Sequence, residues 1–188
     1  MNSCVNQSKV YGFLRMILNL GFWFSAAFFL LFLISLPAGA VFHSNLQFSP
    51  SISFDGLLFT CEIEKADAFY WQYTFMTGVV YCLGLLCIWM LRGLVYSLDK
   101  GSPFIPKNVN RIRIIGWAVL VQAYLHQLIV YHYVQKFLHT AAYREVNDVL
   151  QARFNLLPEG AVLALCILIL AEVFRYGCVL QQEHDTTV

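Results

Sequence analysis

Four long apolar blocks constrain this chain more than any other feature of its sequence. Each block is long enough to cross a bilayer, for which a helix needs about 20 residues. Only 12% of the 188 residues are charged and 59% are hydrophobic, whereas about a quarter of an average soluble domain is charged. The sequence therefore predicts an all-α integral membrane protein, in which four transmembrane helices form a bundle.

Residues 1–188 are predicted to form a single membrane domain. Its boundaries follow from the apolar runs and from the charged and turn-forming residues that flank them. The spans are expected at about 15–42, 69–98, 111–134 and 159–180, the outer loops at 43–68 and 135–158, and a cytoplasmic loop at 99–110.

The first apolar block has a competing interpretation as a cleaved signal peptide. Ala38, Gly39 and Ala40 resemble a cleavage site, and Lys9 and Arg15 precede the apolar run. The apolar core of a signal peptide covers roughly 7–15 residues, and this run is longer. We therefore expect an uncleaved span.

The two outer loops carry different patterns. In the first, Asp55 and Gly56 are turn formers between short β-prone runs, which predicts a small β-hairpin or an extended outer loop between spans 1 and 2. In the second, apolar residues recur at helical spacing among charged ones, which predicts a surface helix between spans 3 and 4. These apolar residues are Val146, Leu150, Phe154 and Leu157.

Basic residues set the expected orientation of the chain. With both termini on one side of the membrane, eight of the twelve Lys and Arg residues lie on that side and four on the other. The eight are Lys9, Arg15, Arg92, Lys100, Lys107, Arg111, Arg113 and Arg175. Because short cytoplasmic loops carry an excess of Lys and Arg, both termini and the loop at 99–110 are predicted to be cytoplasmic.

The cytoplasmic loop contains signals for the end of one helix and the start of the next. Gly101 is placed as a C-terminal helix cap, and Pro103 follows it, where a helix cannot continue. Pro106 with Asn108 or Asn110 then precedes the next apolar run, as expected at a helix start. The loop is therefore a tight turn between antiparallel spans.

The third span is the most polar of the four. Gln122 and His126 are four residues apart and share a helix face, and Glu172 is an ionisable residue in the fourth span. Polar side chains at membrane depth normally face other helices, so we interpret these three mainly as interior hydrogen-bonding groups. Glu172 lies near the inner end of its span, where an ion pair with Arg175 is a further interpretation. A proton-coupled carrier is the alternative. A haem protein is a third, but it needs a second axial ligand, and the second and fourth spans contain no histidine.

Several classes of function lack support in the sequence. A net charge of +1 leaves no basic excess to neutralise nucleic-acid phosphates. The six cysteines include no CxxC pair, and no catalytic triad, phosphate-binding loop or metal-ligand cluster is recognisable. We expect no enzymatic activity, no catalytic or metal-binding residue, no cofactor and no direct contact with nucleic acid.

The loop and the C-terminal segment carry a family resemblance. The motifs are Gly101-Ser102-Pro103-Phe104, then Asn110-Arg111, and the tail from Glu172 to Val188. In their order and spacing within a four-span layout they resemble the bacterial membrane family catalogued as domain of unknown function 2975. The resemblance implies a small multi-pass protein of the bacterial inner membrane, often encoded beside a small helix-turn-helix regulator, and it implies no established activity.

These observations favour a non-enzymatic signalling or interaction protein in contact with membrane lipid. Its cytoplasmic loop and tail are expected to dock a protein such as a helix-turn-helix regulator. In the tail, Glu183 and Asp185 are expected to pair with basic residues of the loop and of the start of the third span. The candidate docking residues are Gly101, Pro103, Phe104, Lys107, Arg111, Arg113, Glu183 and Asp185.

Overall fold

The computed structural model describes the backbone of residues 2–41, 51–54, 57–60, 68–101, 103–139 and 155–187. Side chains are described for most of the helical residues between 11 and 184. The four long helices are α1 (Asn2–Val41), α2 (Ala68–Asp99), α3 (Pro106–His139) and α4 (Glu159–Thr187). The helix predicted on the surface between spans 3 and 4 falls mostly on residues outside the described ranges.

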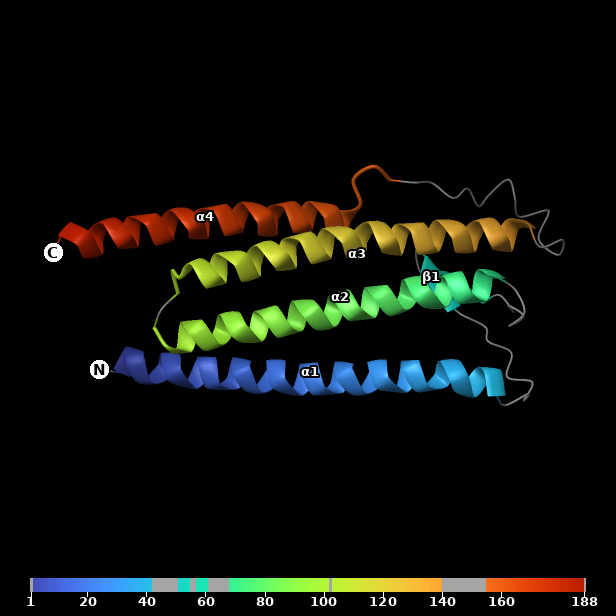
Figure 1. Ribbon diagram of the computed structural model, residues 1–188, viewed down its shortest axis with the longest axis horizontal. Coiled ribbons are helices and arrows are strands. Elements are labelled where there is room, and N and C mark those ends of the chain that lie inside the picture. Colours follow the sequence, from blue (N-terminus) through green and yellow to red (C-terminus); the bar gives the residue numbers. More distant parts are fainter. Residues whose placement is uncertain are drawn as a thin grey trace.

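All four helices are long and apolar enough to cross a membrane, which confirms the four-span membrane class. They run antiparallel in chain order, and both termini lie at the same end of the molecule (Figure 1). We call this end the terminal end. It also carries the turn between α2 and α3.

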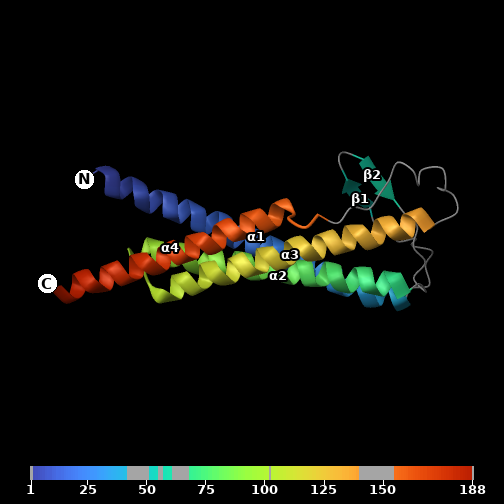
Figure 2. The same ribbon diagram turned by 90° about the horizontal axis from the view of Figure 1, so that it is seen from above.

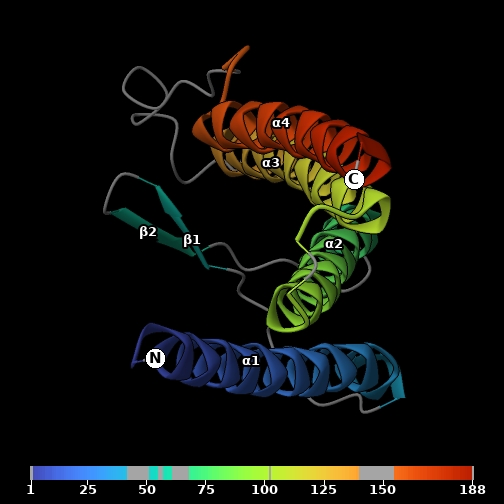
Figure 3. The same ribbon diagram turned by 90° about the vertical axis from the view of Figure 1, so that its left-hand side faces the viewer.

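The helices stand in an open curved row, not in a closed ring. The extensive contacts join α1 to α2, α2 to α3 and α3 to α4, and Figure 3 shows α1 and α4 at opposite ends of the arc. In the most apolar part of each span, 0% of the residues of α1 are buried, compared with 22% of those of α3. Helix α3 is therefore at the packed centre of the described chain.

Two short strands follow α1 in the sequence and precede α2. Strands β1 (Ser51–Phe54) and β2 (Leu57–Thr60) pair antiparallel, with Phe54 opposite Leu57 and Ser51 opposite Thr60. Asp55-Gly56, the dipeptide between them in the sequence, is among those most favoured in two-residue hairpin connections. The strands lie at the end of the molecule opposite the terminal end, to one side of the helices (Figure 2).

Small residues bring α3 and α4 together. Ala161, Ala164 and Ala171 of α4 are at most 1% exposed. A Cβ added at Gly116 of α3 would lie 2.7 Å from Leu168, and one at Gly160 would lie 2.8 Å from Ala123. Without side chains at these positions the two backbones approach closely, as is common where helices pack in membranes.

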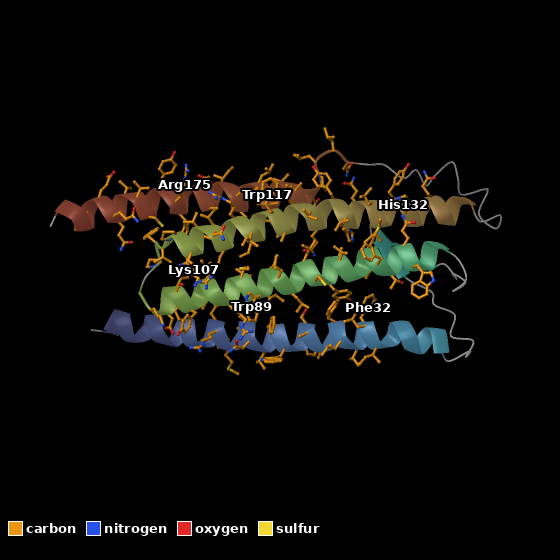
Figure 4. All side chains as sticks on the ribbon, viewed as in Figure 1. Phe32, Trp89, Lys107, Trp117, His132 and Arg175 are labelled. Atoms are coloured by element: carbon orange, nitrogen blue, oxygen red, sulfur yellow. The ribbon has the colours of Figure 1, made fainter. Side chains whose placement is uncertain are left out.

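Aromatic side chains fill the contact between α1 and α2. The Phe32 ring packs on Tyr81 with centroids 5.7 Å apart, and Phe22 packs on Trp89 at the same centroid distance. Phe32 also covers Gly78, where an added Cβ would lie 3.6 Å away. Figure 4 shows Phe32 and Trp89 in the space between these two helices.

Two helix starts differ from the predicted boundaries. Helix α1 begins at Asn2, well before the span expected from residue 15. Polar residues before the apolar run are also helical, so the apolar run alone does not show where the helix begins. Helix α3 begins at Pro106, five residues before the expected span. Proline suits the first position of a helix because its missing N–H has no partner there in any case.

Candidate functional site

The turn between α2 and α3 is closed by a glycine cap. Gly101 has a φ of 71°, and its N–H donates to the Leu98 carbonyl at 3.0 Å. Glycine adopts this left-handed conformation without steric cost. The predicted cap at Gly101 is therefore confirmed.

Asn108 holds the turn against the first residues of α3. Its side chain is fully buried, and its amide nitrogen donates to the Pro103 carbonyl at 3.0 Å. Its amide oxygen accepts a hydrogen bond from Arg111 Nη1 at 3.0 Å. Of the predicted start signals, Pro106 is the first residue of α3. Asn108 and Asn110 lie inside the helix and do not cap it, because the first bonds of α3 are accepted by the Ile105 carbonyl.

Arg111 joins α3 to α2. Its Nη1 donates to the backbone carbonyl of Gly93 and to Ser97 Oγ, the latter at 3.2 Å. A Cβ at Gly93 would lie 2.7 Å from the guanidinium carbon of Arg111, so the guanidinium lies directly on the α2 backbone. The described contacts do not include the predicted pairing of Arg111 with the acidic tail. Arg111 donates instead to the Gly93 carbonyl and the Ser97 hydroxyl of α2 and to the side-chain amide oxygen of Asn108.

Arg113 joins α3 to α4. Its Nη2 lies 2.7 Å from Glu172 Oε1, and Arg175 Nε lies 2.8 Å from Glu172 Oε2. The side chains of Arg113 and Glu172 are 42% and 43% exposed. The interpretation that Glu172 pairs with Arg175 is therefore confirmed. In the described contacts Arg113 also pairs with Glu172, and not with a carboxylate of the tail.

Phe104 attaches the turn to α4. Its ring packs on Phe174 with centroids 5.5 Å apart. A Cβ at Gly177 would lie 2.7 Å from two carbons of the Phe104 ring, so the ring rests on the backbone of α4. The turn and the last part of α4 therefore form one packed unit.

The predicted docking residues fall into three groups. Gly101, Lys107 and Glu183 are exposed, and Phe104 keeps 42% of its surface exposed. Pro103, Arg111 and Arg113 are partly buried and take part in the contacts described above or lie next to them. For Asp185 the structure describes the helical backbone and no side chain.

The predicted intramembrane site is not brought together. His126 is exposed on α3, and Gln122 is partly buried. Glu172 lies beside Arg113, and His126 lies thirteen positions after Arg113 in α3, which is about 20 Å along the helix. A single site of Gln122, His126 and Glu172 is therefore incompatible with the antiparallel pairing of α3 and α4.

Gln127 and a basic cavity are features that the sequence analysis did not identify. The Gln127 side-chain oxygen is buried without a hydrogen-bond partner among the described residues. A cavity of about 300 Å³ lies where α1, α2 and α3 meet near the terminal end, and Arg15, Arg92 and Arg111 line it. The only sequence signal for this cavity is the position of the three arginines slightly inside the ends of three different spans.

No group of three or more His, Cys, Asp or Glu side chains that could hold a metal ion occurs within the described ranges. No curated protein and no solved structure matches the chain.

A family comparison does give a match, over residues 59–188. The matched range starts in β2 and includes α2, the turn, α3 and α4, so it is more than half of the chain and leaves α1 outside. The chain therefore belongs to the family described as "Protein of unknown function (DUF2975)".

Proposed function

We propose that this chain is a non-enzymatic interaction protein of the bacterial inner membrane, which docks a soluble protein at the terminal end. The positive-inside rule places that end in the cytoplasm. The docking surface is the loop–tail surface, which we define as Gly101, Phe104, Lys107 and Glu183. A small helix-turn-helix regulator is the partner that the family resemblance implies.

The packing of Phe104 on Gly177 carries this proposal. This contact fixes the turn to α4, and the Arg113–Glu172 ion pair fixes the start of α3 to the same helix. A surface that is already ordered before binding loses less conformational entropy when a partner docks. Exposed Lys107 and Glu183 add charges of both signs at its rim, and such charges select a partner and its orientation.

The test measures binding between two purified proteins. The full chain is reconstituted in nanodiscs, and its affinity is measured for a purified small helix-turn-helix regulator of the kind that the family resemblance implies. Glu183→Lys is expected to weaken binding about tenfold, because reversing a rim charge turns an attraction into a repulsion. Glu159→Lys is the matched control, since Glu159 is an exposed glutamate at the opposite end of the same helix.

Two results would overturn the proposal. One is saturable binding that falls equally with both substitutions, and the other is no binding by the unaltered chain. The carrier alternative gains no observation of its own, because Glu172 lies far from Gln122 and His126. The haem alternative likewise gains none from the described residues.

A further inference from the structure

The basic cavity at the terminal end is built from three helices. It takes Arg15 and Asn19 from α1, Arg92 and Tyr96 from α2, and Arg111 from α3. None of the residues that line it is acidic. Trp89 forms part of its wall, and Figure 4 shows this residue between α1 and α2.

Aromatic rings hold two of the arginines in place. The Arg92 guanidinium lies 4.7 Å from the centroid of the Phe22 ring and 5.8 Å from that of Trp89. The Arg15 guanidinium lies 5.5 Å from the Tyr96 ring. Stacking on a ring orients a guanidinium and leaves the N–H groups at its edge able to donate.

The positive charge of the cavity has no carboxylate partner among the described residues. The ion pairs of Arg113 and Arg175 are both with Glu172 of α4, and neither arginine lines the cavity. The hydrogen bonds that Arg111 donates to Gly93, Ser97 and Asn108 all come from Nη1. Its other nitrogens are therefore not used by these bonds.

The three arginines lie near the ends of the candidate spans, where lipid headgroups are expected. Arg15 lies four residues inside the α1 span, Arg111 five residues inside the α3 span, and Arg92 seven residues inside the α2 span. At 1.5 Å per residue this is roughly 6–10 Å from the span ends. Cations at this depth are costly unless an anion or water satisfies them.

We propose that this cavity binds a phosphate-bearing anion. Arg15, Arg92 and Arg111 donate to the phosphate oxygens, because the fork of N–H groups on a guanidinium matches phosphate geometry. Asn19 also lines the cavity, and its side-chain amide is able to bind polar groups attached to the phosphate. The source is either an anionic phospholipid or a soluble phosphate, and the experiment below separates them.

The test uses the full chain in neutral detergent with Trp89 as its reporter. Trp23, Trp71 and Trp117 are replaced by Phe, so that fluorescence comes from the wall of the cavity alone. The probes are dioctanoyl phosphatidylglycerol, dioctanoyl phosphatidylcholine and inorganic phosphate. Saturable binding of phosphatidylglycerol alone identifies a lipid site, whereas saturation by inorganic phosphate identifies a site for soluble phosphates.

The arginines are tested by neutral substitution. Arg92→Gln is expected to weaken binding of the saturating probe at least tenfold, because a charge-assisted hydrogen bond is lost. Arg15→Gln is a second variant, since Arg15 is exposed and its removal disturbs the packing of the helices least. Arg175→Gln removes a charge from the same end outside the cavity and is expected to leave binding unchanged.

Three results would overturn the proposal. The first is that neither phosphatidylglycerol nor inorganic phosphate binds saturably. The second is that phosphatidylcholine binds as tightly as phosphatidylglycerol, which would show that the anionic charge is not recognised. The third is that Arg175→Gln weakens binding as much as Arg92→Gln or Arg15→Gln, which would indicate a general effect of surface charge.

Discussion

Arg111 of α3 lies on the backbone of Gly93 in α2, so closely that a Cβ at position 93 would be 2.7 Å from its guanidinium carbon. The guanidinium cannot move away freely, because Nη1 donates to the Gly93 carbonyl, Ser97 and Asn108. The contact between α2 and α3 at the terminal end therefore depends on a glycine and an arginine together.

Gly93→Ala is expected to destabilise the protein by about 1–3 kcal/mol, because a displaced Arg111 loses hydrogen bonds that involve a charged group. The free energy of unfolding is measured by titration with a denaturing detergent, followed by circular dichroism. Gly84→Ala is the control in the same helix, where an added Cβ meets nothing within 4 Å. It is expected to have no effect or to stabilise by up to about 1 kcal/mol. Equal effects of the two substitutions would contradict the role of Arg111.

Asn108→Ala is expected to cost about 1–3 kcal/mol, because it removes the donor to the Pro103 carbonyl and one of the three acceptors that Arg111 uses. Asn108→Asp keeps the acceptor for Arg111 and loses the donor to Pro103, so it is expected to cost less than Asn108→Ala. The same denaturation experiment gives both values. Asn110→Ala, at an exposed position two residues along, is the control. Equal losses with Asp and with Ala would show that the Pro103 bond dominates, and a larger loss with Asp than with Ala would contradict the expected order.

Phe104→Ala is expected to loosen the turn from α4, because it removes the ring that covers Gly177 and Phe174. Since the ring is 42% exposed, we expect a loss of about 1–2 kcal/mol, less than the 3–5 kcal/mol typical of a fully buried Phe. Hydrogen exchange is the measurement, and the amides from Gly101 to Ile105 and near Gly177 are expected to exchange faster. Unchanged exchange at Gly177 would show that the contact does not hold the two segments together.

The Arg113–Glu172 pair is expected to show a small favourable coupling. Both side chains are more than two-fifths exposed, so a double-mutant cycle with Arg113→Gln and Glu172→Gln is expected to give about 0.5–1 kcal/mol. Lys107→Gln combined with Glu172→Gln is the control cycle, with no coupling expected. A coupling that does not fall when the salt concentration rises would contradict a partly exposed ion pair.

The four-helix membrane class could be predicted because the length of an apolar run decides whether a helix spans a bilayer. The cap at Gly101 could be predicted because few residues other than glycine adopt a positive φ. The start of α3 could be placed only to within Pro106, Asn108 and Asn110, because asparagine is a common cap residue and nothing local shows that Asn108 is buried. Local signals thus identify the turn and leave its hydrogen bonds undetermined.

The partners of Arg111 and Arg113 could not be predicted for a related reason. Opposite charges in the sequence suggest pairing of Arg111 with the tail, whereas its hydrogen bonds go to oxygens that carry no net charge. The basic cavity depends on how far each helix is rotated about its axis. A helix that is apolar on all sides, such as α1, gives no preferred face from which that rotation can be inferred.

The open row of helices has a consequence for how the chain assembles. Each helix makes its extensive contacts with its neighbour in the sequence, so few contacts need distant segments to meet, and such topologies assemble quickly. The contact between α1 and α2 is able to form before α3 is synthesised, and α4 is added last, onto a completed α3. An error in inserting α4 would then leave the α1–α2 pair and the arginine cavity intact.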